Sequence, residues 1–198
     1  MSSLKFGPGY SVATYQATAA WGQQIIRSPT SGSDPGQDFV VKDLGTVANL
    51  NQYGLVSDAF AARYGALEAY EFQCEPNGIN SNYCTGTWPG EAAQPGFKVR
   101  LIPCGQSSGT IWAQYTGTPG GDTAVPGFQM YIAGATDNFS NPEVLNYPVG
   151  NPGDMPRPWV NVQPLSDYSN GNVFNNQQWA TFTPPPPPPP PPPAPPVP

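Results

Sequence analysis

The sequence predicts a mainly β protein, with an antiparallel β-sandwich or jelly-roll-like body and an extended arm at each end. Three observations support this fold class. Short segments alternate apolar and polar residues, runs rich in Pro and Gly separate them, and helix signals are few. The chain has 198 residues, which is enough for one domain with a core and additional extensions.

Residues 1–67 are expected to form an extended N-terminal segment that carries a degenerate repeat. The copies are DLGTV at 43–47, QYGLV at 52–56 and RYGAL at 63–67. Gly at this place permits a bulge or a turn with positive φ, and the Val or Leu that follows resumes an apolar face. Chance similarity between two turns and a helix is the alternative. We expect Tyr53 and Tyr64, the rings of two copies, to contact a partner.

One helix is predicted, over Ser57–Tyr70, because the stretch is rich in Ala and begins with the possible N-caps Ser57 and Asp58. Gly65 falls inside this stretch and weakens the helix prediction.

Residues 68–135 are expected to be the β core. Strands are predicted at Tyr70–Cys74, Phe97–Pro103, Thr110–Tyr115 and Phe128–Ala133. In FKVRLIP, Phe97, Val99 and Leu101 share one face, and the two cations between them point the other way, which is typical of a half-buried strand. The aromatic residues expected in this core are Trp88, Trp112, Tyr115, Phe128 and Tyr131.

Residues 136–183 contain too many prolines for regular structure, so we expect an irregular segment that runs over a surface. Residues 184–198 form a polyproline tail with ten consecutive prolines. Because proline sets φ and lacks the backbone donor, this tail is expected to be polyproline II.

The tail has three interpretations: a strut along neighbouring subunits, a ligand for an aromatic groove, or a low-complexity end without a role. We favour the strut, because a stiff segment loses little entropy when it docks. Trp179 and Phe182 are expected to anchor its base and to contact a partner. The predicted partner contacts of the tail itself are represented by Pro184, Pro188 and Pro193.

The charge and residue content exclude several functions. Charged residues make up 10% of the chain, against about 25% for an ordinary soluble domain, and the net charge is −6. The cations are scattered, which argues against nucleic-acid binding. There is no histidine, and no nucleophile elbow or phosphate loop is found. We therefore predict no catalytic residue, no metal site, no cofactor and no enzyme activity.

The three cysteines leave two possibilities open. A disulfide between Cys74 and Cys84 would close a small loop and leave Cys104 free, or all three thiols are reduced. The N-terminal residues show no basic start followed by an apolar run, and no stretch has the length of a membrane helix. We expect no secretory signal and no membrane contact.

The repeat resembles segments in structural proteins of marine cyanobacterial tailed phages. The best match is Gln52–Asp58 (QYGLVSD), with weaker matches at Asp43–Ala48 and Arg63–Leu67. The resemblance implies a virion component of the capsid, neck, tail or fibre. It would bind other virion proteins, associate with copies of itself and be located in the virion.

Two alternatives belong to other classes. In a carbohydrate- or receptor-binding module, Trp88 and Tyr83 would stack on sugar rings. In a proline-rich adaptor, the tail would bind SH3 or profilin-type domains.

Overall fold

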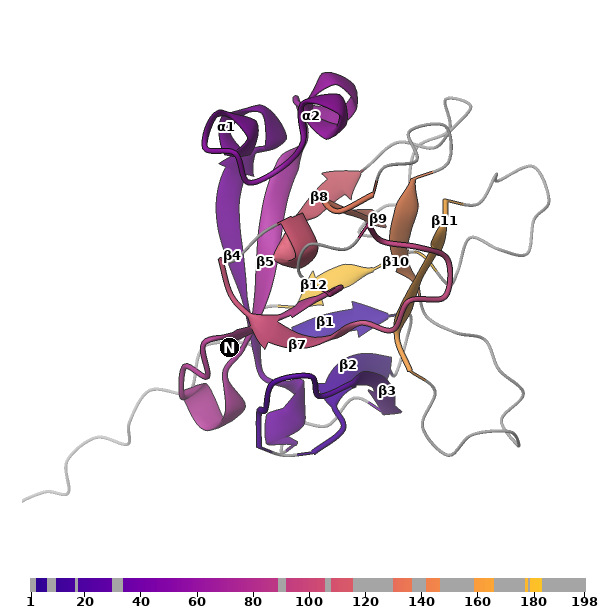
Figure 1. Ribbon diagram of the computed structural model, residues 1–198. Coiled ribbons are helices and arrows are strands. Elements are labelled where there is room, and N and C mark those ends of the chain that lie inside the picture. Colours follow the sequence, from indigo (N-terminus) through magenta and orange to yellow (C-terminus); the bar gives the residue numbers. More distant parts are fainter. Residues whose placement is uncertain are drawn as a thin grey trace, which may run out of the picture.

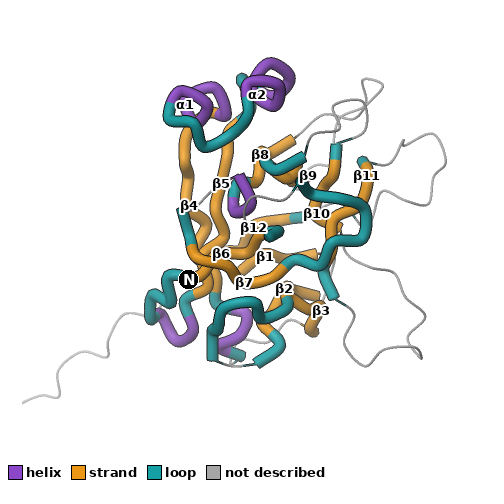
Figure 2. Tube along the Cα trace, in the orientation of Figure 1, coloured by secondary structure: helices purple, strands orange, loops and turns teal. Residues whose placement is uncertain are grey.

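The fold of the chain is mainly β (Figure 1; Figure 2). The computed structural model describes residues 3–6, 10–16, 18–29, 34–88, 92–105, 108–115, 130–136, 142–146, 159–165, 177 and 179–182. The strands in these ranges are β1 Ser3–Phe6, β2 Tyr10–Thr14, β3 Ile25–Pro29, β4 Phe39–Thr46, β5 Glu68–Cys74, β6 Tyr83–Gly86, β7 Arg100–Pro103, β8 Trp112–Tyr115, β9 Met130–Ala133, β10 Glu143–Asn146, β11 Asn161–Pro164 and β12 Ala180–Phe182. The α-helices of the same ranges are α1 Val47–Gln52 and α2 Asp58–Tyr64. Neither is long and apolar enough to cross a membrane.

The strands form three sets of four that pair in the same way. In each set the first strand pairs with the second and the second with the third, as in β1–β2–β3, β5–β6–β7 and β9–β10–β11. The sets are joined by the pairs β4–β5, β8–β9 and β12–β1. All of these pairs are antiparallel. The strand order is therefore that of a threefold repeat, and not that of the predicted sandwich or jelly roll.

The third strands of the three sets meet at one end of the molecule around an approximate threefold axis. The N–H of Ile25 donates to the carbonyl of Val99 (3.0 Å), Val99 to Val160 (2.9 Å), and Val160 to Ile25 (2.9 Å). All three side chains are buried. The neighbouring bridges repeat the same cyclic order: Gln24 with Arg100, Lys98 with Asn161, and Trp159 with Ile26.

A buried aromatic residue stands at or just before the start of each fourth strand. Phe39, Trp112 and Trp179 are each completely buried. The indole N–H of Trp112 donates to the carbonyl of Thr85 (3.0 Å), and that of Trp179 donates to Leu145 (2.9 Å). These bonds join the fourth strand of a set to its second strand, and they satisfy the polar atom of a buried indole.

The helices α1 and α2 follow β4 and precede β5 in the sequence, and they cover the other end of the molecule (Figure 1). Thr46 and Ser57 cap them, since their hydroxyls accept from the N–H groups of Asn49 (3.3 Å) and Phe60 (3.1 Å). The helix predicted to reach Tyr70 ends at Tyr64. From residue 68 onward the chain pairs with β4, so strand pairing overrides the local helix preference.

The predicted division at residue 67 is not seen. β4 pairs with β5 along its length, and β1 pairs with β12, so the N-terminal segment is part of the same body. The segment predicted to be irregular, 136–183, contains β10, β11 and β12. The polyproline tail lies outside the described residues.

The glycines of the three repeat copies have different backbone roles. Gly45 (φ +78°) lies at a bulge in β4, and Gly54 (φ +71°) lies in the turn after α1. Gly65 ends α2 with a right-handed φ of −54°. The copies are therefore alike in sequence but not in structure.

Candidate binding surface

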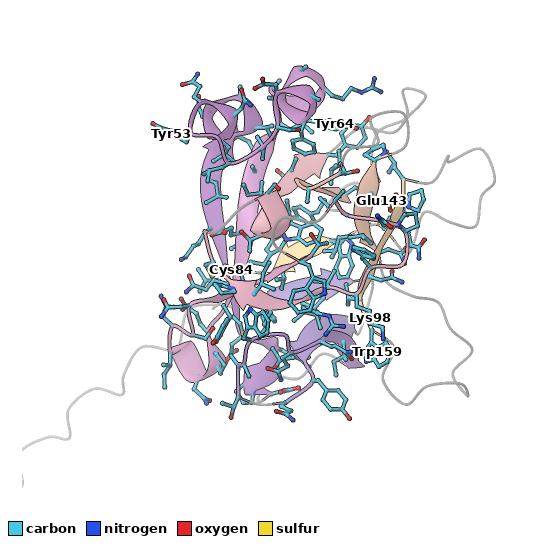
Figure 3. All side chains as sticks on the ribbon, in the orientation of Figure 1. Tyr53, Tyr64, Cys84, Lys98, Glu143 and Trp159 are labelled. Carbon is cyan, nitrogen blue, oxygen red and sulfur yellow. A yellow bond between two sulfur atoms is a disulfide. The ribbon has the colours of Figure 1, made fainter. Side chains whose placement is uncertain are left out.

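Three tryptophans and two cations gather where the third strands meet. We call Trp21, Trp88, Lys98, Arg100 and Trp159 the aromatic surface. Figure 3 shows Lys98 beside Trp159. These residues are three of the five tryptophans of the chain and two of its seven Lys and Arg residues. The cations predicted to be scattered are therefore partly concentrated on this face.

Trp21 is the outermost ring of the aromatic surface. It is 58% exposed and meets Trp88 edge-on, with ring centroids 5.3 Å apart and planes at 63°. The Arg100 guanidinium carbon lies 5.3 Å from the Trp88 centroid, and the guanidinium donates to the carbonyl of Gly22 (3.3 Å). Trp88 is half-buried beneath these contacts and supports Trp21. The indole that stays open to a ligand is therefore that of Trp21.

The loop that carries Trp21 is held by backbone bonds to β7. The N–H of Gly22 donates to the carbonyl of Leu101 (2.7 Å), and the N–H of Leu101 donates to that of Gln23 (2.7 Å). Gly22 has φ +76°, a conformation that favours glycine. The side chain of Gln23 also accepts from the N–H of Ala20 (3.0 Å) and donates to the carbonyl of Gln16 (2.9 Å). The loop is therefore fixed before any ligand arrives.

Strand β7 and the residues before it place the cations. Val99 and Leu101 are completely buried, and Phe97 packs partly buried against the same core, so these three residues share a face as predicted. The strand begins only at Arg100, however, and Ile102 is buried as well. Lys98 and Arg100 point outward, about 7 Å apart along the chain. The Lys98 ammonium lies 3.2 Å from the centroid of the Trp159 ring. Both cations therefore cover tryptophan rings.

The predicted sugar-stacking pair is separated. Trp88 belongs to the aromatic surface, whereas Tyr83 is half-buried and packs against the core. Trp21, the most exposed of the five tryptophans, was not among the predicted site residues. Its signal is an isolated aromatic residue in a polar loop, ATAAWGQQ, outside any alternating pattern.

The predicted partner-binding residues have different positions. Trp179 is buried in the core of its own chain, so its prediction as a partner contact is wrong. Tyr53 is 80% exposed at the end of α1, and Tyr64 is buried at the end of α2. The backbone of Phe182 lies in β12, while Pro184, Pro188 and Pro193 lie outside the described residues.

Both possibilities for the cysteines are wrong, because Cys84 is bonded to Cys104. In the β5–β6 pair the residue opposite Cys84 is Gln73, so the side chain of Cys74 points to the other face of the sheet. Cys74 is free and buried, and burial raises the pKa of its thiol to about 12. A thiol with so high a pKa is a poor nucleophile.

Two buried carboxylates have different environments. Glu71 accepts from the N–H of Gly105 (2.8 Å) and the hydroxyl of Thr110 (2.5 Å). It also lies close to the sulfurs of Cys84 and Cys104, which are bonded to each other and so are not thiolate ligands. Glu143 has one buried oxygen without a hydrogen-bond partner, and burial raises its pKa to about 7.

Comparison with known proteins identifies the fold. No family model matches the chain, and no curated protein matches it. Among solved structures, it is similar to ThreeFoil, a designed three-fold symmetric protein, with TM-score 0.56 and 17% identity over 92% of this chain and 97% of that one. The fold is β-trefoil-like.

Two further structures share this fold. One is a mosquitocidal holotoxin (TM-score 0.52, 13% identity), where the match covers 91% of this chain but 16% of the toxin chain. The other is a protein of unknown function from Caenorhabditis elegans (TM-score 0.51, 9% identity), with 91% and 92% of the two chains covered. At these identities the likeness concerns the fold alone.

Proposed function

We propose that the chain is a saccharide-binding module and that Trp21 is its stacking platform. The observation that carries this proposal is the open indole of Trp21, which stands on a loop bonded to β7 and is supported edge-on by Trp88. A rigid aromatic platform loses little conformational entropy on binding. The apolar face of a pyranose ring packs on such an indole.

The groups around Trp21 suit a ligand rich in hydroxyls. The Arg100 guanidinium has five N–H donors, and only one hydrogen bond from it, to the carbonyl of Gly22, is described. The side chain of Gln24, on the neighbouring bridge to Arg100, is an amide that both donates and accepts. Stacking on a ring with polar donors at its edge is a typical arrangement for orienting a small polar ligand.

The virion role, the self-association and the use of the polyproline tail stay predictions. The virion role and the saccharide-binding proposal differ in what they expect at the aromatic surface. A virion subunit would cover Trp21 with a neighbouring protein, whereas a receptor-binding module would leave it open to glycans.

The proposal is tested with a glycan array, followed by calorimetry on the best ligand. We expect Trp21→Ala to weaken binding at least tenfold, because a stacked aromatic contact is lost. Tyr53→Ala is the matched control, since it removes another exposed ring at the other end of the molecule and should leave binding unchanged. The proposal fails if the native protein binds no glycan, or if both variants lose the same affinity.

A further inference from the structure

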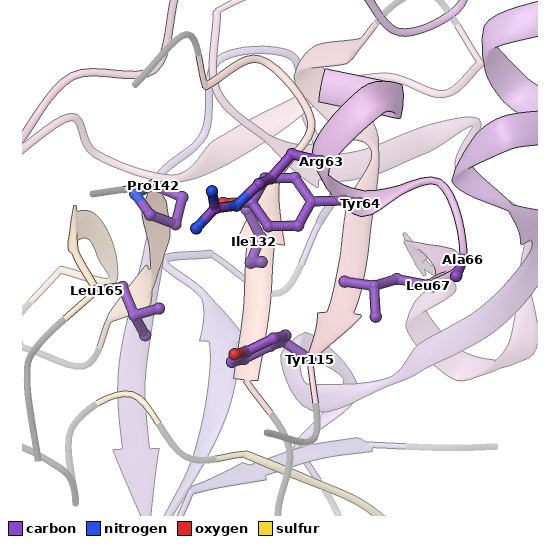
Figure 4. Close-up of a pocket in the computed structure, with 8 residues that line it drawn as sticks. All are labelled: Arg63, Tyr64, Ala66, Leu67, Tyr115, Ile132, Pro142 and Leu165. Atoms are coloured by element: carbon purple, nitrogen blue, oxygen red, sulfur yellow. The ribbon is translucent and has the colours of Figure 1, made fainter. Parts of the chain in front are cut away.

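A pocket of about 300 Å³ lies at the end of the molecule covered by α1 and α2 (Figure 4). It opens where the end of α2 meets β9 and the ends of β8 and β11. Its volume is at the lower end of the range for small-molecule sites, about 300–1,000 Å³. In Figure 3, Tyr64 of this pocket and Trp159 of the aromatic surface are at opposite ends of the molecule, so the two sites are separate.

The wall of the pocket is apolar and held in place. Ile132 is completely buried, and Leu67 and Leu165 are half-buried beside it. The N–H of Leu67 donates to the carbonyl of Tyr64 (2.9 Å), and that of Leu165 donates to Pro142 (2.8 Å). These bonds fix the backbone on both sides, so the pocket is formed before a ligand enters.

The polar groups of the pocket are one guanidinium and two phenols, from Arg63, Tyr64 and Tyr115. Burial raises the pKa of Tyr64, although hydrogen bonding and attraction from Arg63 act in the opposite direction. The Tyr64 hydroxyl therefore remains neutral. The ring of Tyr64 is held against Phe60, with centroids 5.0 Å apart.

The charge at the pocket is not neutralised within the described part of the chain. No carboxylate is among the residues that line the pocket, and no described carboxylate forms an ion pair with Arg63. Arg63 is exposed, in a chain of net charge −6. Figure 4 shows its guanidinium reaching across the pocket toward Pro142. A positive group over an apolar wall matches a ligand with the opposite charge at one end.

We propose that this pocket binds a small amphipathic anion, with its hydrocarbon body against Leu67, Ile132 and Leu165 and its carboxylate at Arg63. The carboxylate accepts a charge-assisted hydrogen bond from the guanidinium. A neutral apolar ligand would use the same wall but gain nothing from Arg63, and a cation would be repelled.

Three probes with the same hydrocarbon body test the proposal: octanoate, octan-1-ol and octylammonium. Binding to the full chain is followed by ¹H–¹⁵N NMR, which also reports which amides shift. We expect octanoate to bind about tenfold more tightly than octan-1-ol, with octylammonium weakest, and the shifts to centre on Leu67 and Leu165.

Arg63→Gln should remove the preference for octanoate over octan-1-ol, because only the head-group contact is lost. Lys42→Gln removes one positive charge from β4 and is the matched control, which should keep the preference. The proposal is overturned if octanoate does not bind, if Arg63→Gln keeps the full preference, or if the shifts centre on β7.

Discussion

At the end of the molecule where the third strands meet, the Trp21 ring faces outward on a loop bonded to β7, whereas at the end covered by α1 and α2 the rings of Phe60 and Tyr64 face inward. Trp21 is 58% exposed and Phe60 is completely buried. The Trp21 ring is the proposed platform for a flat ligand, and Tyr64 lines the pocket proposed for a narrow one. Aromatic residues are thus buried or exposed depending on whether their segment packs over the core, as α2 does, or is bonded to its outside, as the Trp21 loop is.

The largest expected effect is a loss of stability in Phe60→Ala, with Trp21→Ala as the variant for comparison. Phe60 lies in the buried cluster beneath the helices, so its removal should lower the free energy of unfolding by about 3–5 kcal/mol. Trp21→Ala should change it by about 0.5 kcal/mol or less, because the ring is mostly exposed. Urea denaturation measures both values. Equal losses of stability in the two variants would contradict the distinction between an end that is part of the core and an end that is surface.

Removal of the disulfide should have the next largest effect on stability. It should also change the aromatic surface more than the pocket. The Cys84–Cys104 bond spans 20 residues and closes the β6–β7 hairpin, with Trp88 and Arg100 between the two cysteines. We expect Cys84→Ser/Cys104→Ser to lower the free energy of unfolding by about 2–4 kcal/mol. Tryptophan fluorescence should change, while octanoate binding at the pocket should not.

Cys74→Ala is the control for this double variant, because Cys74 is buried but not bonded. It should leave the fluorescence of the aromatic surface as it is. If the double variant instead abolishes octanoate binding with the fold intact, the two ends are coupled and the comparison fails.

A smaller effect is the pH dependence contributed by Glu143, next to Pro142 at the pocket. Its pKa is raised to about 7 in the folded chain, against about 4.3 when unfolded. Between these values the folded state holds a proton that the unfolded state has lost, so stability should fall as pH rises from about 4.3 to 7, by about 1–3 kcal/mol. The contribution becomes constant only above about pH 8, where the folded state has lost this proton as well.

Glu143→Gln should flatten this part of the stability curve, measured by urea denaturation at several pH values. Glu71→Gln is a contrasting variant, because Glu71 has two described hydrogen-bond donors. An unchanged slope in Glu143→Gln would show that another group is responsible.

The sequence was informative wherever the deciding pattern was local. The alternation in FKVRLIP predicted the face shared by Phe97, Val99 and Leu101, and Ser57 was one of the two predicted helix caps. It was misleading where one residue type has two uses. Trp179 was predicted to contact a partner and is part of the core, while Trp21, in a loop without a pattern, is the exposed ring.

The sequence by itself determined that the chain is mainly β, because a period of two and the Pro- and Gly-rich breaks are properties of neighbouring residues. Only the tertiary structure decided the threefold arrangement, the pairing of Cys84 with Cys104 and the gathering of Trp21, Trp88 and Arg100. These contacts join residues that are far apart along the chain. Their choice depends on how the three sets of strands pack together, which no local pattern encodes.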